Sequence, residues 1–403
     1  MAGIRSPQVQ GQVAPGFETV RDKFAENFVR RRELGGACCA YVDGEKVVDL
    51  WGGIRNKATG ASWDADTMVI VYSATKGLAA MTLAVAHSRG WLDYDERVSA
   101  YWPEFAERGK GSITVRQLLA HQAGLYALDQ PVDRATVADP DRLAIVLARQ
   151  APQWEPGTRQ GYHAITLGYY ENELLRRIDP RHRTIGQFFQ DEIATPLGLD
   201  VYIRLPESVP TEQLATIARP DFVAMVRGLP VRFLLDALNK RSKISRALRG
   251  SELPHDAERI YARNFEVPSG GGVGTARAIA HAYGVFATGG HELGLRRATV
   301  DLLAAPAIPP VNGFYDECMK TWGVQFSLGF MKPGPAIAFG SPSSFGSPGA
   351  GGAMGFADPE NRLGYAYVTS QMGTRLTGDP RDIALRNAIY RVLRDRPRAR
   401  KAA

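Results

Sequence analysis

Residues 73–90 have the sequence SATKGLAAMTLAVAHSRG. Ser73 and Lys76 stand three residues apart at its start, and that spacing puts both side chains on the same side of a first helical turn. The apolar residues that follow repeat at helical spacing and form one face: Leu78, Met81 and Val85. The pattern therefore predicts a helix that stops at Gly90.

The segments on either side of this helix predict further helices and strands. An apolar helical face opens the chain and stops at Gly35-Gly36. Two strands, 38–42 and 46–51, flank Asp43-Gly44, a dipeptide that favours tight hairpin turns because both residues can adopt positive φ. From about residue 66 the pattern is mostly helical, and the remaining expected elements are strands 324–330, 336–339 and 364–370 and a last helix, 380–394.

This order of elements predicts an α+β fold in which both ends of the chain meet on one antiparallel sheet. We expect residues 1–65 and 265–403 to form the lobe that contains the sheet and the terminal helices, and residues 66–264 to form an inserted helical lobe. Within the helical lobe, residues 222–248 are a candidate lid or pocket wall, because their first half is apolar and their second half is basic. A subunit contact and a helical hairpin packed on its own lobe are the alternatives. A cleft between two lobes is a natural place for a ligand.

The composition is that of an ordinary globular chain. Of 403 residues, 44% are hydrophobic and 23% are charged, which excludes collagen, coiled coil and general disorder. The net charge of +7 comes partly from the C-terminal end and partly from basic residues between 240 and 249. Because no nucleic-acid motif accompanies either run, we interpret both as solvated surface and expect no nucleic-acid partner.

Targeting and cysteine signals favour a cytoplasmic protein. The N-terminal residues lack the apolar run of a signal peptide, and no window approaches the roughly 18 continuous apolar residues of a membrane-spanning helix. Cys38, Cys39 and Cys318 lack the spacing of a disulfide framework, so we expect reduced thiols. The histidines show no metal-ligand spacing, and we expect neither a metal nor another cofactor.

Three side chains could carry chemistry together. The Ser73 hydroxyl becomes a nucleophile when a neighbour takes its proton, and Lys76 can do so in an apolar setting. Tyr162 follows a turn at Pro156-Gly157, and a phenol beside a lysine can act as a general base. The glycine-dense stretch 345–352 lets a substrate approach the backbone and leaves a main-chain N–H free to donate.

As a set, these motifs resemble the serine β-lactamase-like superfamily, and most of all class C β-lactamases and family VIII carboxylesterases. The resemblance covers about residues 15–395 in the family's order and implies a β-lactamase/transpeptidase-like fold with its active site between the lobes. Besides S-x-x-K and the tyrosine after Pro-Gly, it rests on Leu118-Leu119-Ala120-His121-Gln122-Ala123-Gly124-Leu125, Gly272-Val273-Gly274-Thr275-Ala276 and a glycine-rich element before G-F-A-D-P.

The resemblance also implies a role for each motif residue. Ser73 corresponds to the acylated nucleophile, Lys76 to its proton-sharing partner and Tyr162 to the general base or acid. The oxyanion hole is expected to combine the main-chain N–H groups of Ser73 and Ala350, with Gly349 beside them. The implied reaction forms an acyl-enzyme and releases an alcohol, after which water or another alcohol takes the acyl group.

Three departures from the family pattern favour neutral esters over β-lactams and cell-wall peptides. Where the lactamases and peptidases carry K-T-G, this chain has Ser347-Pro348-Gly349 and therefore no cation for a substrate carboxylate. Ala164 takes the place of the asparagine in Y-x-N. The chain also shows no export signal, whereas those substrates lie outside the cytoplasm.

We therefore expect a serine hydrolase that cleaves small carboxylic esters. An acyltransferase differs only in the alcohol that accepts the acyl group, and a β-lactamase or D,D-peptidase is a further alternative. A non-catalytic binding module is disfavoured because Ser73, Lys76 and Tyr162 are all present. We interpret His121 as structural, leave His163 facing either the cleft or solvent, and leave a homo-oligomer open.

Overall fold

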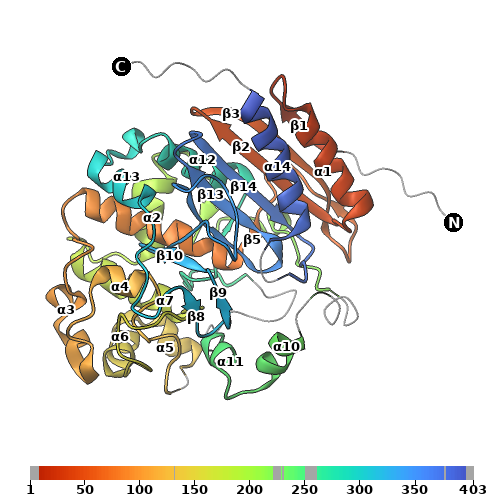
Figure 1. The fold of residues 1–403 in the computed structure, drawn as a ribbon. Coiled ribbons are helices and arrows are strands. Elements are labelled where there is room, and N and C mark those ends of the chain that lie inside the picture. Colours follow the sequence, from red (N-terminus) through yellow and green to blue (C-terminus); the bar gives the residue numbers. More distant parts are fainter. Residues whose placement is uncertain are drawn as a thin grey trace.

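The computed structural model describes residues 9–130, 132–220, 228, 231–249, 261–375 and 378–395. Figure 1 shows a sheet with helices on both faces beside a region rich in helices. Helices α1 (Glu18–Arg30) and α14 (Pro380–Asp395) pack against each other next to this sheet. The early and late parts of the chain therefore meet in one place, as predicted.

The main sheet has nine strands in the described part of the chain and is antiparallel throughout. They are β1 (Val9–Val13), β2 (Gly35–Val42), β3 (Glu45–Asn56), β4 (Ala61–Ser62), β10 (Gln325–Ser327), β11 (Phe330–Lys332), β12 (Phe345–Pro348), β13 (Met354–Asp358) and β14 (Leu363–Thr369). The order is β1-β3-β2-β14-β13-β12-β11-β10, with β4 beside β3. The pairing of β2 with β14, where Cys39 stands opposite Ala366, joins the two ends of the chain.

The hairpin between β2 and β3 turns where the sequence predicts. Asp43 and Gly44 have φ values of +53° and +81°, which is the left-handed conformation that a tight hairpin turn requires. Strand β1 is not predicted from the sequence. It is a short edge strand whose sequence, VQGQV, shows little apolar character, so its pairing with β3 leaves no clear local signal.

Two of the late strands differ from the prediction. The apolar run 324–330 is divided into β10 and β11 by a turn at Leu328-Gly329, where φ is +52° and +86°. Residues 336–339 form no strand, although Ile337 is buried in the apolar cluster between the sheet and α14. An apolar run indicates burial, and burial alone does not distinguish a strand from a packed loop.

The two faces of the sheet pack against different helices. Cys38 and Ala40 of β2 face the cluster that contains α1 and α14, whereas Cys39 faces the cluster that contains α12 (Ala276–Ala287). Adjacent residues of a strand point to opposite faces, so the two neighbouring cysteines lie in separate cores. Both, like Cys318, are buried free thiols, as expected.

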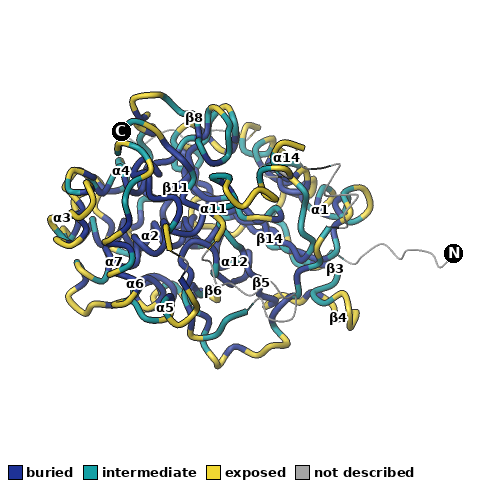
Figure 2. Tube along the Cα trace, turned by 90° about the horizontal axis from the view of Figure 1, so that it is seen from below, coloured by how far each residue is buried: buried dark blue, intermediate teal, exposed yellow. Residues whose placement is uncertain are grey.

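The helical region is built around α2 (Thr75–Ser88), which begins directly after Ser73 and Ala74. Every residue of α2 except His87 is buried, and Figure 2 shows this helix in dark blue. The other helices of this region and its surroundings are α3 (Val98–Tyr101), α4 (Val115–Leu119), α5 (Arg134–Ala138), α6 (Pro140–Arg149), α7 (Thr166–Ile178), α8 (Ile185–Phe189), α10 (Val231–Leu238), α11 (Lys243–Ala247) and α13 (Arg297–Ala304). Helix α2 packs against α7 and α8 and also against β11 and β12, so it joins the helices to the sheet.

Short strands complete the architecture. One small sheet has the order β5 (Val69–Ile70), β7 (Val273–Gly274), β6 (Val201–Tyr202), and β8 (Tyr315–Asp316) pairs with β9 (Thr321–Trp322). The lobe boundaries at residues 65 and 265 stay a prediction. Of the segment 222–248, residues 222–227, 229 and 230 lie outside the described residues. In the described part of the chain, no helix combines the length and apolar character that crossing a membrane requires.

Candidate active site

Ser73 lies in a 3₁₀ turn, Tyr72–Ala74, at the N-terminal end of α2. Tyr72 has a φ of +47°, which is uncommon for a residue with a Cβ. The turn is held by Thr75, whose Oγ1 donates to the Tyr72 carbonyl at 2.5 Å and accepts from the Gly272 N–H at 2.8 Å. The N-terminal end of a helix carries partial positive charge, which favours negative charge on the Ser73 oxygen.

Lys76 is buried, and three acceptors hold its ammonium beside Ser73. Its Nζ donates to the Ala164 carbonyl at 2.6 Å, to the Ser269 carbonyl at 2.8 Å and to Ser73 Oγ at 3.3 Å. A lysine ammonium has three N–H donors, so this set uses all of them. The two main-chain carbonyls therefore position the amine toward the serine hydroxyl.

Two other buried lysines show what distinguishes Lys76. Lys110 and Lys332 each donate to three main-chain carbonyls and to no hydroxyl. Burial lowers the pKa of Lys110 to about 8 and that of Lys332 to about 7. Among the buried lysines of the described residues, Lys76 is thus the one that contacts a serine hydroxyl.

Tyr162 completes the contact around Ser73. Its Oη donates to Ser73 Oγ at 2.8 Å, and Lys76 Nζ lies 4.9 Å from the centroid of its ring. Phe326 of β10 stacks on this ring with an angle of 10° between the planes, and His121 packs against it at a tilt. The three side chains predicted from the sequence therefore lie together, and both Lys76 and Tyr162 contact the Ser73 hydroxyl oxygen.

Two buried histidines hold the segment that carries Tyr162. His163 Nε2 accepts from the Leu125 N–H at 2.9 Å, so its Nδ1 carries the proton that is donated to the Gly161 carbonyl at 2.6 Å. His121 Nδ1 accepts from the His163 N–H at 2.9 Å. Burial lowers the pKa of His163 to about 4 and holds the pKa of His121 well below its usual range. Both rings are therefore neutral acceptors of main-chain N–H groups, and His163 faces neither the cleft nor solvent.

Strand β12 runs past the turn that carries Ser73. Ser347 Oγ donates to the Ser73 carbonyl at 2.7 Å. A Cβ at Gly349 would lie 2.1 Å from the Val71 carbonyl oxygen, so this close approach requires glycine. The Gly349 N–H donates to the Ala353 carbonyl at 2.7 Å, whereas the Ala350 N–H takes part in none of the hydrogen bonds found among the described residues. The expected role of Gly349 and Ala350 in the oxyanion hole stays a prediction. Because the Gly349 N–H is already bonded, Ala350 is the better candidate donor to an oxyanion.

The position of the K-T-G lysine offers a hydroxyl instead of a cation. Ser347 stands there, and its hydroxyl is already bonded to the Ser73 carbonyl. Lys332 on the neighbouring strand β11 is 2% exposed and donates to main-chain carbonyls, so it does not replace the missing charge. Within the described ranges, no group of three or more His, Cys, Asp or Glu could hold a metal ion.

Two residues that surround this site were not predicted from the sequence. Ser269 supplies a carbonyl to Lys76, and its Oγ accepts from the Gly168 N–H of α7 at 2.7 Å. Glu171 of α7 is fully buried, and neither of its carboxyl oxygens has a hydrogen-bond partner among the described residues. Its Oε1 lies 3.0 Å from the position that a Cβ at Gly329 would occupy. Ala80, which stands one helical turn after Lys76 on α2, lies next to the same position. No local signal in the sequence marks either residue.

Burial raises the pKa of Glu171 to about 8, although the positive charge of Lys76 acts in the opposite direction. Glutamate in the unfolded chain ionises near 4.5. Between these values the folded state keeps a proton that the unfolded state has released. The contribution of Glu171 to stability therefore falls as the pH rises through this range.

Replacing Glu171 by glutamine is expected to stabilise the protein at alkaline pH, because the amide keeps the shape of the side chain and cannot ionise. We expect the melting temperature of Glu171→Gln to exceed that of the wild type by several degrees at pH 8.5 and by much less at pH 5. Thermal unfolding followed by circular dichroism measures this difference. Glu45→Gln, at an exposed site, is the control, and an equal difference at both pH values would contradict the assignment.

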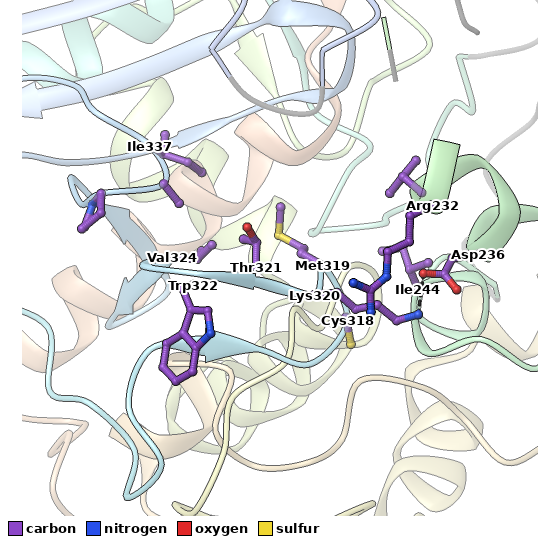
Figure 3. Close-up of a pocket in the computed structure, with 13 residues that line it drawn as sticks. Arg232, Asp236, Ile244, Cys318, Met319, Lys320, Thr321, Trp322, Val324 and Ile337 are labelled. Carbon is purple, nitrogen blue, oxygen red and sulfur yellow. Dashed lines mark hydrogen bonds and ion pairs between the residues drawn. The ribbon is translucent and has the colours of Figure 1, made fainter. Parts of the chain in front are cut away.

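A cavity of about 470 Å³ lies beside the segment that carries Tyr162 (Figure 3). Val324 lines it, and the Val324 carbonyl accepts from Gln160 Nε2 at 2.8 Å, two residues before Tyr162. In Figure 3, Arg232 and Asp236 of α10 lie on one side of the cavity and Trp322 lies on the other. Helix α10 thus borders a cavity, and the role of residues 222–248 toward a substrate stays a prediction.

Comparison with known proteins identifies the family. The family model described as Beta-lactamase matches residues 20–388. The chain belongs to the beta-lactamase family. It is similar to "Esterase/beta-lactamase LipL" of Mycobacterium tuberculosis, with 30% identity over 375 residues that cover 91% of this chain and 83% of LipL.

Solved structures of this family agree with the fold. The chain is similar to a family VIII carboxylesterase, with 36% identity and a TM-score of 0.82 over 96% of this chain and 100% of that one. A penicillin-binding protein homolog from Caulobacter crescentus gives 33% identity and a TM-score of 0.81, over 96% of this chain and 100% of the homolog. The predicted β-lactamase/transpeptidase-like fold is confirmed, and the chain is a hydrolase of the beta-lactamase-like family.

Proposed function

We propose that this hydrolase cleaves small carboxylic esters through an acyl-enzyme on Ser73. The observation that carries the proposal is the convergence of Tyr162 Oη and Lys76 Nζ on Ser73 Oγ, at 2.8 Å and 3.3 Å. A hydroxyl in contact with groups that can take and return its proton is what covalent catalysis by serine requires. The names of two relatives, a carboxylesterase and an esterase/beta-lactamase, support the same chemistry.

In the first step Tyr162 acts in its phenolate form, and its oxygen accepts the Ser73 proton while Ser73 Oγ forms a bond to the ester carbonyl carbon. The positive charge of Lys76 beside the Tyr162 ring favours the phenolate that this transfer needs. The carbonyl oxygen becomes an oxyanion, which accepts hydrogen bonds from the N–H groups of Ser73 and Ala350. The bond to the alcohol oxygen then breaks, and Tyr162 returns the proton to the departing alcohol.

The second step repeats this sequence with water. Tyr162 accepts a proton from water as the water oxygen attacks the acyl carbon. The bond between the acyl carbon and Ser73 Oγ breaks, and the proton returns to Ser73. The net reaction converts one ester and one water into one carboxylic acid and one alcohol, with no electron transfer and no further reactant.

The charge of the site supports neutral esters as the substrate class. Ser347 stands where a lysine would grip a substrate carboxylate, and Lys332 is held away from the site by main-chain carbonyls. Ala164 has no amide to position a substrate side chain, and its carbonyl is occupied by Lys76. A β-lactam or peptide that carries a carboxylate would therefore enter the site with its charge unpaired, which disfavours binding.

Turnover of two substrate classes tests the proposal. We expect kcat/KM for p-nitrophenyl acetate and butyrate to exceed that for a chromogenic cephalosporin by at least about 10²-fold. Because the Mycobacterium tuberculosis relative is named for both activities, both are measured on the same preparation. Cephalosporin turnover as efficient as ester turnover would contradict the substrate class, and the absence of any ester turnover would contradict the proposed function.

A further inference from the structure

The outer face of helix α10 carries an apolar stripe that points into solvent. The side chains of Val231, Leu235 and Leu238 are 66%, 63% and 80% exposed. At 100° per residue they lie within an arc of about 60° on the helix surface. The other side of α10 faces the protein, where Phe233 packs against the helical core and Asp236 pairs with Lys320. This is the reverse of an ordinary surface helix, whose apolar stripe faces the core.

The segment that carries this stripe is rich in cations. Residues 231–249 contain six Lys and Arg side chains against one carboxylate, Asp236. Lys243 pairs with Glu317 and Arg246 with Asp129. The other four cations are exposed, and none of them forms an ion pair with a described residue: Arg232, Lys240, Arg241 and Arg249.

The end of α11 adds to the same surface. Arg249 donates to the Lys240 carbonyl at 2.9 Å, which places this end against the turn that follows α10. Leu248, the neighbour of Arg249, is 48% exposed. Figure 1 shows α10 and α11 at the margin of the molecule. We call this surface the α10 patch, which consists of Val231, Leu235, Leu238, Leu248, Lys240, Arg241 and Arg249.

The combination of apolar and cationic side chains in the α10 patch favours an anionic lipid surface over a second copy of this chain. A symmetric dimer places the same patch of two copies face to face, so unpaired cations would oppose cations. An anionic lipid surface suits both parts of the patch. Aliphatic side chains enter the boundary between headgroups and acyl chains, and lysine and arginine side chains neutralise anionic headgroups.

We propose that the α10 patch docks this protein on an anionic lipid surface. The basic residues near 240, which the sequence analysis interpreted as solvated surface, are then its electrostatic contacts. The inner face of α10 lines the cavity that Cys318 and Val324 also line, so a docked molecule holds this cavity close to esters dissolved in the lipid. This last consequence rests on the proposed function, whereas the docking does not.

Flotation of the purified protein with lipid vesicles tests the docking. We expect binding to vesicles of equal parts phosphatidylcholine and phosphatidylglycerol to be at least about tenfold tighter than binding to pure phosphatidylcholine, and to weaken in 0.5 M NaCl because salt screens the cations. The double variants Leu235→Asp/Leu238→Asp and Lys240→Gln/Arg241→Gln should each lose at least about tenfold in affinity.

Two controls make the test specific. Val29→Asp changes an apolar residue on α1 that is 72% exposed and should bind like the wild type. Leu235→Asp/Leu238→Asp should hydrolyse dissolved p-nitrophenyl acetate at the wild-type rate, because neither residue borders the site. If flotation behaves as expected and ester turnover is absent, the proposed function is wrong and the docking stands.

Three results would overturn the docking proposal. These are equal binding to both kinds of vesicle, no binding to either, and binding that the α10 variants leave unchanged. Light scattering after size-exclusion chromatography adds a further outcome. A dimer that Leu235→Asp/Leu238→Asp dissociates, in a protein that binds no vesicles, would assign the patch to a second copy of this chain.

Discussion

Ester turnover by the Ser73→Ala variant is expected to fall by at least about 10⁴-fold in kcat. Without Oγ no acyl-enzyme forms, and Tyr162 and Lys76 lose the atom on which they converge. Ser73 is only partly buried, so water can replace its hydroxyl as a partner, and we expect the melting temperature to change little. Steady-state kinetics with p-nitrophenyl butyrate, together with thermal unfolding, measures both quantities.

Ser99→Ala is a matched control for this variant. Ser99 lies on α3, and its Oγ donates to the Gly111 carbonyl at 3.1 Å, a contact that does not involve the site. The control should keep the wild-type kcat. A Ser73→Ala protein that retains more than about one hundredth of the wild-type turnover would exclude the acyl-enzyme mechanism.

The next largest effect is expected for Lys76→Met, which should lower kcat by about 10²- to 10⁴-fold. The substitution removes the amine that contacts Ser73 and leaves the carbonyls of Ala164 and Ser269 without their donor. Each unpaired buried carbonyl costs about 1 to 3 kcal/mol, so the variant should also be less stable. Kinetics must therefore separate loss of catalysis from loss of folded protein.

The variant Lys110→Met is the control that distinguishes loss of catalysis from loss of folded protein. Lys110 is buried and donates to the carbonyls of Glu107, Ala148 and Gln150, so its loss leaves three carbonyls without a donor. We expect Lys110→Met to lose at least as much stability as Lys76→Met and to keep kcat once the concentration of folded protein is corrected for. If both variants lose kcat equally, Lys76 is a structural lysine and has no part in the proton transfer.

Tyr162→Phe tests the other contact of Ser73. Phenylalanine retains the ring that stacks on Phe326 and packs against His121, and it removes only the hydroxyl that lies 2.8 Å from Ser73 Oγ. We expect a fall in kcat of about 10²- to 10⁴-fold with little change in stability. A wild-type pH profile and kcat in this variant would remove Tyr162 from the mechanism.

The parts of the fold that depend on neighbouring residues could be predicted from the sequence. The Asp43-Gly44 turn is specified by two residues that tolerate positive φ, and the helix after Ser73 is specified by the spacing of its apolar residues. The resemblance to a known family supplied the roles of Lys76 and Tyr162. In the structure both side chains contact Ser73 Oγ, and their catalytic roles stay predictions.

Contacts between distant segments could not be predicted. The Ser269 carbonyl bonds to a lysine 193 positions earlier in the chain, and nothing near Ser269 indicates this. Glu171 has the pattern of one more polar residue on an amphipathic helix, and its burial arises only when α7 packs against α2. The apolar run 324–330 shows the same limit, since its hydrophobicity does not reveal the turn at Leu328-Gly329.

The orientation of α10 also could not be predicted from the sequence. The apolar first half and basic second half of residues 222–248 are compatible with a lid or pocket wall and also with a helical hairpin packed on its own lobe. Only the exposed fractions of Val231, Leu235 and Leu238 show that the apolar stripe points outward. Position relative to the rest of the molecule, and not composition, therefore decides what such a helix can bind.

Covalent labelling can show whether Ser73 is the residue that an ester acylates. A p-nitrophenyl alkylphosphonate mimics the ester: the serine oxygen attacks phosphorus, p-nitrophenolate leaves, and a stable phosphonyl-enzyme remains. We expect intact-protein mass spectrometry to show one phosphonyl group per chain, peptide mapping to locate it on Ser73, ester turnover to disappear in step with labelling, and Ser73→Ala to remain unlabelled. Stoichiometric inactivation with the label on any other residue would contradict the account.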